Sequence, residues 1–538
     1  MKQSLRLVVA VLFFIPLAFV LLHFFKALKL IVTDSSNFQI FWSDYVYHSS
    51  LLSFKIALLS LFVSLVLVFL CGYAIFRLKN RRVHFFLSFF LSVPHLAFFS
   101  GTLFLIMSSG FVSRALYSVT GLDLSSYLGW ESDPGGISFA ITLALKESLF
   151  LIFASLVKIE DGIFDKYQNI SKSYGYKSFT AWLYLIWPRI LHSIRYPIWM
   201  VLAYTMSVVD LSLSLGPTNP PPFSVVLWEY FGSSSLDSQI KSQMGSLHIL
   251  FLLVATIAFY EICFYLFQKI TLLSLKWKVL DLKFLSPRAI LNSYFSFQLL
   301  PILILLLWAF SGEWVFPDIF PQILTTQNIF QGLEVIGPHI VTTLSLGLIS
   351  SLVSIVICLF WFEWDHGAVS QPITLAFLLV PVFPMLPLLY GFNIFILETQ
   401  SRHLSSYFAV LYVHIFLILP YTYLMLKDSF IKFDKRIKNV ALGLNSSSFK
   451  FFFNVRLPSL RGVIGTAFSV SFAVSVSQYL ATVMIGGGRV ETLTTDAVVA
   501  VIGQNRKLTA VNGLFQILLP LTVFLISQRL SKRMRRDV

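Results

Sequence analysis

Twelve stretches of mainly apolar residues run through this 538-residue chain. A helix needs about 20 such residues to cross the hydrocarbon core of a bilayer. The stretches lie at approximately residues 7–25, 52–76, 84–107, 136–157, 194–216, 246–268, 294–312, 337–362, 371–395, 404–426, 463–486 and 511–529. Charged residues make up only 12% of the chain, against about 25% in soluble domains. The sequence therefore predicts an all-α polytopic membrane protein with about 12 transmembrane helices, embedded in a lipid bilayer.

The positions of lysine and arginine predict the orientation, because cytoplasmic loops hold an excess of these residues. If both termini are cytoplasmic, the cytoplasmic segments hold 30 of the 40 basic residues and the external loops hold 8, while Lys55 and Lys146 fall within helices. The net charge of +15 then orients the chain against the anionic cytoplasmic leaflet. We expect no nucleic acid as a partner. The N-terminus lacks a small-x-small cleavage site, so the first helix is expected to stay uncleaved.

Two polar segments of the chain repeat one pattern. "NISKSYGYKSFTAWLYLIWP" (169–188) aligns without a gap with "NVALGLNSSSFKFFFNVRLP" (439–458). Each copy predicts a short helix, a breaker and a second helix that closes at a proline. Gly175 and Asn445 occupy the breaker, and these two residue types most readily accept the left-handed conformation that ends a helix. The swap indicates a backbone requirement at this position.

The second helix of each copy is expected to begin at a capping serine. Ser178-Phe179 and Ser448-Phe449 follow the breaker, and serine is a preferred N-cap. The resulting amphipathic helix–turn–helix suits a groove on a protein, although one such hairpin suits a lipid surface equally well. Two copies at equivalent places favour a symmetric docking surface.

The repeat extends to the apolar stretches. Stretches one to three align with seven to nine at an offset near 287, which brings Pro94 onto Pro381, and stretches four and five align with ten and eleven near 270. Six helices plus six predict a parallel duplication about an axis along the membrane normal, which favours a transport pathway between the halves. The predicted domains are a first half (1–269, with the loop 165–192), a cytoplasmic linker (270–292) and a second half (293–538, with the loop 434–461).

The two polar copies resemble the EAA loop of ABC importer permeases. Asn169-Ile170-Ser171 and Asn439-Val440-Ala441 stand at its E-A-A positions, and Leu185 to Pro188 and Val455 to Pro458 stand at its closing I-x-L-P. The six-plus-six layout, together with "IGGGRVETLTT" (485–495), resembles the fused thiamine and ferric-iron permeases. Asn replaces the family's glutamate in both copies, and Ile170-Ser171 replace the paired alanines, so the electrostatics of docking are expected to differ.

The resemblance implies the partners and the place of the chain. Each copy would form a coupling helix in a cleft of one of two ABC ATPase subunits. The implied coupling residues are Asn169, Ser171, Tyr174, Gly175, Ser178 and Phe179 in the first copy, and Asn439, Ala441, Leu444, Asn445, Ser448 and Phe449 in the second. A periplasmic substrate-binding protein would dock on external loops, with 113–136 and 216–239 as candidates. The chain would be a multi-pass protein of a bacterial inner membrane with both termini cytoplasmic.

Ionisable residues inside membrane helices are functional hypotheses by default. Asp210 and its counterpart near Gln478 would face the substrate pathway if their helices line it, as they do in the resembled family. Pro94 and Pro381 interrupt helices and can free backbone carbonyls near that pathway. Asp210 could equally hold a helix contact. Lys146-Glu147 is interpreted as a structural or gating pair, and packing roles are expected for His95 and Glu261.

The sequence argues against an enzyme. It has no GxxxxGK[ST] phosphate loop, so ATP hydrolysis is expected from partner subunits, and no cofactor or metal is expected. Cys71, Cys263 and Cys358 lie in apolar runs and are expected to be buried packing residues.

The alternative function is a secondary transporter of the parallel six-plus-six type. That class predicts matching charged loops after helix two and its repeat, but "RLKNRR" (77–82) has no partner in 362–371. Substrate identity stays open among thiamine, ferric iron, polyamines and oxyanions.

Overall fold

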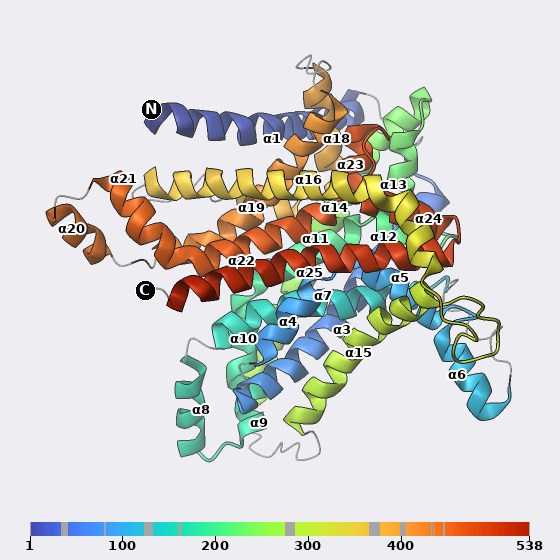
Figure 1. Ribbon diagram of the computed structural model, residues 1–538, viewed down its shortest axis with the longest axis horizontal. Coiled ribbons are helices and arrows are strands. Elements are labelled where there is room, and N and C mark those ends of the chain that lie inside the picture. The colour runs from blue at the N-terminus through green and yellow to red at the C-terminus, as the bar shows by residue number, and fades with distance from the viewer. Residues whose placement is uncertain are drawn as a thin grey trace.

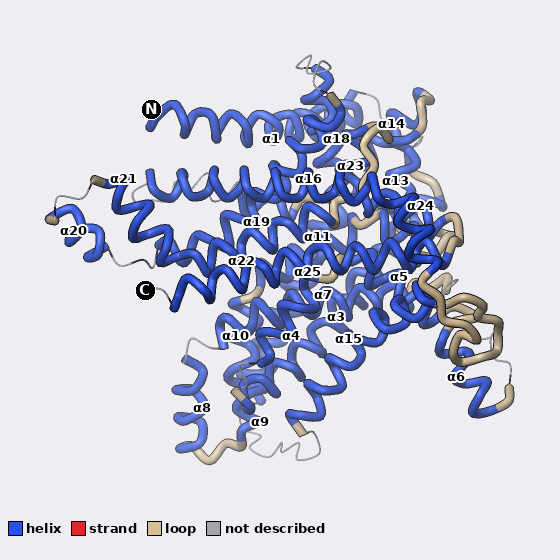
Figure 2. Tube along the Cα trace, viewed as in Figure 1, coloured by secondary structure: helices blue, strands red, loops and turns tan. Residues whose placement is uncertain are grey.

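The computed structural model describes residues 2–33, 41–79, 82–122, 133–159, 163–274, 286–364, 377–398, 405–431, 433, 435–444 and 447–536. Within these ranges the chain is helical and contains no strand, apart from an isolated bridge between Ser311 and Leu324. Figures 1 and 2 show long helices packed side by side. The predicted all-α polytopic class is confirmed.

The helices can be divided into two series, which share much of their order of elements. The first series is α1 (Lys2–Thr33), α3 (Asp44–Leu78), α4 (Arg82–Ser92), α5 (His95–Ile106), α6 (Phe111–Thr120), α7 (Ile137–Ile159), α8 (Ile163–Ser173), α9 (Ser178–Ala181), the π-helix η2 (Trp182–Ile186), α10 (Trp187–Ser193), α11 (Arg195–Ser207), α12 (Asp210–Leu215), α13 (Phe223–Gly232) and α14 (Leu236–Ser274). The second is α15 (Pro287–Phe310), α16 (Gln327–Trp364), the 3₁₀ turn η3 (Val380–Val382), α18 (Met385–Glu398), α19 (Ser406–Ile431), α20 (Lys435–Gly443), α21 (Ser448–Phe451), the π-helix η5 (Phe452–Arg456), α22 (Leu457–Val476), α23 (Tyr479–Gly486), α24 (Leu493–Ile502) and α25 (Arg506–Arg536).

Ten helices within the described residues are long and apolar enough to cross a membrane. They coincide with ten of the twelve predicted stretches. The fifth and ninth stretches hold only shorter helices: the fifth divides into α11 and α12, and the ninth contains η3 followed by α18. The predicted linker (270–292) is covered at its two ends by α14 and α15.

Proline positions the break in the third and the ninth stretches, because a proline cannot continue the helical hydrogen bonds of the preceding turn. Pro94 precedes α5, and its carbonyl accepts from the amide of Phe98 (3.2 Å). Pro384 precedes α18 in the same way, and its carbonyl accepts from the amide of Leu388 (3.2 Å). The structural counterpart of Pro94 is therefore Pro384. The predicted alignment with Pro381 is wrong, because Pro381 lies in the 3₁₀ turn before the break.

The packing of the two series is reciprocal. α3 packs on α7 as α16 packs on α19, and α13 packs on α14 as α24 packs on α25. The first helix of each series also reaches the other series: α1 packs against α18, and α15 packs against α5. These crossed contacts tie the two series into one bundle.

The reciprocity extends to individual hydrogen bonds at α13 and α24, which begin 270 positions apart. The amide of Phe223 donates to the hydroxyl of Ser53 on α3 (2.8 Å), and the amide of Leu493 donates to that of Thr343 on α16 (2.9 Å). A side-chain hydroxyl satisfies an N–H that the first turn of a helix leaves without an internal partner.

Candidate functional site

The two polar copies have the same succession of elements. We call residues 163–186 (α8, α9 and η2) the first loop segment, and residues 435–456 (α20, α21 and η5) the second loop segment. The short helix and the π-helix of each segment begin 270 positions apart. Both segments lie at the end of the bundle where the two chain termini lie (Figure 1).

The turn after α8 has the geometry that the sequence predicts. Gly175 has a φ of +78°, which favours glycine because it has no Cβ. Its amide donates to the carbonyl of Lys172 (2.9 Å), and the amide of Tyr176 donates to that of Ser171 (3.0 Å). These two bonds form a Schellman motif that satisfies the last carbonyls of the helix. Asn445, the predicted breaker of the second copy, lies outside the described residues.

The predicted capping serines are wrong by one position. α9 begins at Ser178 itself, its N-cap is Lys177 and it has no side-chain cap. The Ser178 hydroxyl instead accepts from Arg77 Nη1 (3.0 Å). In the second copy the N-cap is Ser447, whose hydroxyl accepts from the amide of Lys450 (3.2 Å).

A π-helical turn precedes the closing proline in each copy. The amide of Trp187 donates to the carbonyl of Trp182, and the amide of Leu457 donates to that of Phe452. A proline has no N–H to donate four residues back, which accounts for a widened turn just before Pro188 and Pro458. Such turns are rare and are frequent at functional sites.

The predicted coupling residues differ in exposure. Seven of them are exposed: Asn169, Tyr174, Gly175, Asn439, Leu444, Ser448 and Phe449. Ser178 and Ala441 are half-buried, while Ser171 and Phe179 are buried. The two buried side chains face the inside of the protein, since Phe179 packs against Phe69 and Tyr73 and the Ser171 hydroxyl donates to the carbonyl of Gln168.

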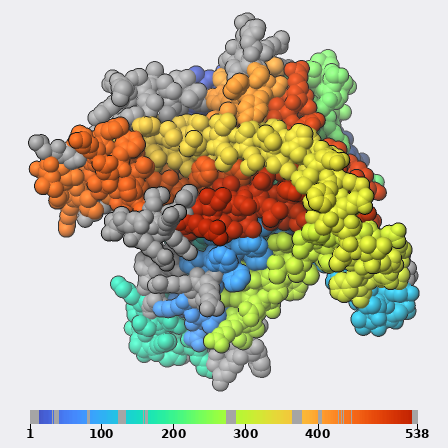
Figure 3. Space-filling model, in the orientation of Figure 1, coloured from blue at the N-terminus to red at the C-terminus, as the bar shows by residue number. Residues whose placement is uncertain are grey.

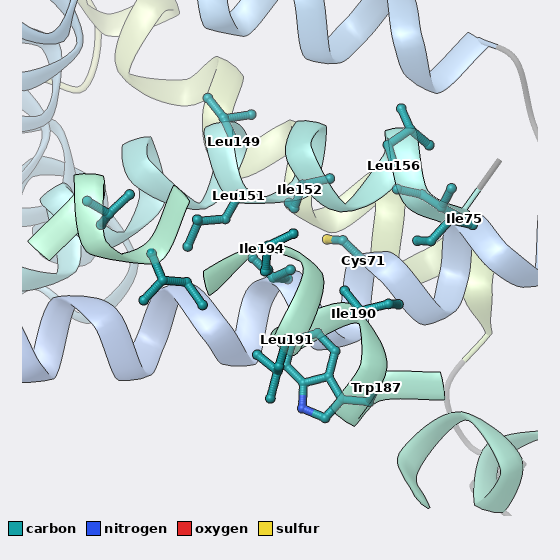
Figure 4. Close-up of a cluster of buried hydrophobic side chains, with 14 of the residues drawn as sticks. Cys71, Ile75, Leu149, Leu151, Ile152, Leu156, Trp187, Ile190, Leu191 and Ile194 are labelled. Carbon is teal, nitrogen blue, oxygen red and sulfur yellow. The ribbon is translucent and has the colours of Figure 1, made fainter. Parts of the chain in front are cut away.

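Aromatic packing holds the first loop segment to the bundle. Trp182 is fully buried, and its ring lies 5.6 Å from that of Phe76 and 6.0 Å from that of Tyr73. A Cβ on Gly72 would lie 3.1 Å from the indole, so any larger residue there would require the ring or α3 to shift. Figure 4 shows part of the same apolar cluster, in which Ile190 lies near Cys71 and Trp187 lies beside Leu191.

Ion pairs hold the second loop segment. Glu363 near the end of α16 pairs with Arg456 of η5 (2.6 Å) and with Lys438 of α20 (3.4 Å). Arg456 also donates to the carbonyl of Phe430 (3.2 Å) and lies over the rings of Phe430 and Phe433. The exposed fractions of the Glu363, Arg456 and Lys438 side chains are 12%, 14% and 25%. Sequence analysis missed this cluster, because Glu363 is far from both basic residues along the chain.

Asp210 and Gln478 lie at matching breaks. Asp210 opens α12, and Gln478 precedes α23. The Ser214 hydroxyl donates to the Asp210 carbonyl (2.7 Å), as the Thr482 hydroxyl donates to the Gln478 carbonyl (2.5 Å). Both Asp210 and Gln478 are half-buried.

Three tyrosines that sequence analysis did not single out lie near these polar residues. Tyr204 of α11 and Tyr479 of α23 are close enough to Asp210 to interact with it electrostatically. Tyr421 of α19 has the same relation to Glu147. Polar residues of both series therefore gather around the break between α11 and α12.

Lys146 and Glu147 of α7 have local partners. Lys146 donates to the carbonyls of Phe90 (2.8 Å) and Val93 (2.6 Å), just before the break at Pro94. This arrangement supports the structural interpretation of Lys146, since carbonyls at a helix break need donors. Glu147 pairs with His95 (3.0 Å).

The other polar residues considered in the sequence have packing roles or exposed positions. Glu261 accepts from Arg195 and from Trp199 Nε1 (2.8 Å), which agrees with the expected packing role. Cys71 and Cys358 are buried, but Cys263 is exposed, so the prediction of three buried thiols is wrong for Cys263. Among the described residues, no group of three or more His, Cys, Asp and Glu side chains could hold a metal ion.

The opposite end of the bundle carries the predicted external loops. α6 and α13, from the candidate stretches 113–136 and 216–239, lie there in Figure 1. Arg114 of α6 is 2% exposed and donates to the carbonyls of Val315 (2.9 Å) and Asp318 (2.7 Å). It thereby fixes α6 to the loop between α15 and α16. Residues 123–132 lie outside the described part of the chain.

Two comparisons with known proteins bear on this arrangement. Residues 366–536 match the family model of the binding-protein-dependent transport system inner membrane component. The matched range contains the second loop segment. The chain is also 28% identical over 446 residues to the inner membrane ABC transporter permease protein YnjC of Escherichia coli (strain K12), an alignment that covers 83% of this chain and 80% of that protein.

Proposed function

We propose that this chain is a multi-pass ABC transporter permease of the inner membrane and forms the substrate pathway of an ATP-driven importer. The match to the transport-component family and the similarity to a permease support this proposal. In this proposal two ATPase subunits dock on the first and second loop segments. The observation that carries it is the duplication of one irregular structure, a helix, a turn, a short helix and a π-turn before a proline, at one end of the bundle. A pair of like subunits requires a pair of like sites.

The exposed residues are the ones that would contact the ATPases. Asn169, Ile170 and Tyr174 in the first segment, and their counterparts in the second, are exposed on α8, on α20 and in the turns that follow these helices. An amphipathic helix that presents an apolar face suits a groove on a protein. The buried Ser171 and Phe179 would position the first segment without touching the partner.

Exposed lysines give the two segments a basic character. Lys166 and Lys172 are exposed in the first segment, as is Lys450 in the second. The family's glutamate is Asn169 or Asn439 here, so neither copy offers a carboxylate at that position. We therefore expect acidic side chains around the ATPase clefts, because complementary potentials align across interfaces.

The proposal includes the orientation of the chain. The excess of basic residues in the loops at the end that carries α8 and α20 supports a cytoplasmic position for that end and for both termini. The opposite end, with α6 and α13, would then face a periplasmic substrate-binding protein.

The alternative, a secondary transporter, shares the parallel layout of two six-helix halves. A secondary transporter would have no function for the two loop segments, which repeat one helix–turn–helix at the same end of the bundle. The importer gives both copies the same role, so we favour it.

Co-purification with an ATPase tests the proposal. The double variant Ile170→Asp, Val440→Asp changes two exposed side chains (54% and 63%) and adds negative charge where acidic clefts are expected. The tagged wild-type chain should recover a phosphate-loop ATPase at two copies per permease. We expect the variant to recover at least about tenfold less, because an unpaired charge at an interface costs more than about 1.4 kcal/mol.

The matched control is Val119→Asp at the opposite end of the bundle, where Val119 is 84% exposed. This variant should retain the ATPase. Purification of the wild-type chain without an ATPase, together with uptake driven by a proton or sodium gradient in vesicles, would replace the importer with the secondary transporter.

We further propose that Asp210 and Gln478 line the pathway, together with Pro94 before α5 and Pro381 in the 3₁₀ turn η3. The test uses a background in which the three native cysteines are replaced. Asp210→Cys and Gln478→Cys should react with a membrane-impermeant thiol reagent at least about tenfold faster than the buried controls Leu211→Cys and Leu480→Cys, because reaction needs an accessible, ionised thiol. Equal protection of all four thiols would refute the pathway assignment.

A further inference from the structure

Five pairs of apolar positions lie 270 residues apart in the two loop segments, and three of these pairs differ in exposure. In the second segment all five side chains are exposed: Ile437 (44%), Val440 (63%), Leu444 (78%), Phe449 (71%) and Phe453 (41%). In the first segment only two of the counterparts are exposed, Ile170 (54%) and Tyr174 (70%). The two segments therefore share one sequence pattern, but the second exposes more apolar surface than the first.

The difference follows from how each segment is held. In the first segment Phe179 is 7% exposed because it packs on α3, and Tyr167 is half-buried under the guanidinium of Arg189 (4.1 Å). Phe179 and Tyr167 therefore pack against this chain itself and expose little surface to a partner. In the second segment Phe449 contacts the exposed Phe453 (ring centroids 4.5 Å apart).

The ion pairs of Glu363, together with the buried Phe451 and Phe452, hold the second segment to the bundle while Phe449 and Phe453 stay exposed. Arg456 stands where the first copy has Ile186, and Lys438 stands where it has Gln168. The two charged side chains attach η5 and α20 to the end of α16. This anchoring leaves the apolar side chains of α20 and α21 free to face outward. Figure 3 shows the second segment protruding from the end of the molecule.

We propose that the two docking sites are unequal, and that the second loop segment provides the greater part of the affinity for the ATPase subunits. The inference rests on the proposed function. Binding free energy rises with the apolar area removed from water, and aromatic residues are enriched among the side chains that dominate interfaces. The occupant is an ATPase subunit with an apolar cleft and an acidic rim, because the exposed Lys450 lies beside Phe449.

Matched double variants test the inequality. The second segment receives Val440→Ser and Leu444→Ser, and the first receives Ile170→Ser and Tyr174→Ser at the equivalent positions. Each variant is placed in lipid nanodiscs, and its affinity is measured for the purified ATPase that accompanies the wild-type chain. A further variant, Phe449→Ser, probes the aromatic side chain that has no exposed counterpart.

We expect the second-segment pair to weaken binding at least about tenfold more than the first-segment pair, and Phe449→Ser to weaken it several-fold on its own. Equal losses from the two pairs would overturn the inequality and leave docking intact. No loss from any variant would overturn the proposed function itself. If the second-segment variants instead lose binding to protein-free anionic vesicles while ATPase affinity is unchanged, that face is a lipid contact and the inference fails.

A thermal unfolding measurement on each nanodisc sample completes the experiment. All of these substitutions are at exposed positions, so the midpoints should stay close to that of the wild-type chain. A variant that unfolds at a clearly lower temperature is replaced by the corresponding Ala variant, which favours the helix.

Discussion

Replacing Trp182 with alanine is expected to release the first loop segment from the bundle. Trp182 is fully buried, and its indole packs against Phe69, Tyr73, Phe76 and Trp187. Removal of a buried Trp side chain leaves a cavity and costs about 3–5 kcal/mol. At Gly72 the backbone of α3 lies so close to the ring that an added Cβ would be 3.1 Å from it, so the indole fills its site tightly and its removal loses many contacts. We therefore expect the upper part of that range.

The buried thiol of Cys71 provides the measurement. Cys71 belongs to the same apolar cluster as Trp182, whereas Cys358 belongs to a different one. In a Cys263→Ser background, thermal labelling with a thiol-reactive dye reports the opening of both clusters. Trp182→Ala should lower the temperature at which Cys71 reacts by more than it lowers that of Cys358.

The equivalent change in the second copy is the control. Phe452, 270 positions after Trp182, is 6% exposed, and Phe452→Ala should leave the labelling of Cys71 near that of the wild-type chain. Trp182→Phe should restore part of the lost stability, because it keeps an aromatic ring in the site. Labelling of Cys71 at the wild-type temperature in Trp182→Ala would show that the indole does not hold the segment.

Local signals in the sequence were sufficient to predict the form of the two segments. Gly175 predicts the turn because few other residues adopt a positive φ at low cost, and the turn has that conformation. Pro188 and Pro458 predict a change in helix geometry, but not that it would be a π-turn. The twelve apolar stretches predict the class, since the length of a span is set by the bilayer.

Contacts between distant residues could not be predicted from those signals. Either Ser447 or Ser448 could cap α21, and the choice depends on which of them has the extended backbone of an N-cap. In the structure it is Ser447. The match of Pro94 with Pro384 depends on loop lengths that differ between the two series. The anchoring of the second segment depends on Glu363, whose partners are brought to it only by the packing of α16, α20 and η5.

Glu363→Gln is expected to detach the second loop segment, which is the second large effect. The carboxylate faces Arg456 at 2.6 Å and Lys438 at 3.4 Å, and the amide of glutamine has nearly the same shape without the charge. Loss of one partner from a buried ion pair costs about 3–5 kcal/mol. Because all three side chains keep some exposure, we expect about 2–3 kcal/mol, most of it through the shorter and less exposed bond to Arg456.

Hydrogen exchange of residues 435–456 measures this effect directly, because their amides should lose protection while those of residues 163–186 do not. The control is Arg77→Gln at the end of α3, where the exposed bond to Ser178 should contribute no more than about 1 kcal/mol. A double-mutant cycle with Arg456→Met isolates the pairwise coupling between Glu363 and Arg456.

If ATP hydrolysis continues in Glu363→Gln while uptake falls, the Glu363 contacts transmit motion from the second loop segment to α16. Unchanged exchange in Glu363→Gln would mean that Arg456 is held by Phe430 and Phe433 alone, and that the carboxylate has no anchoring role.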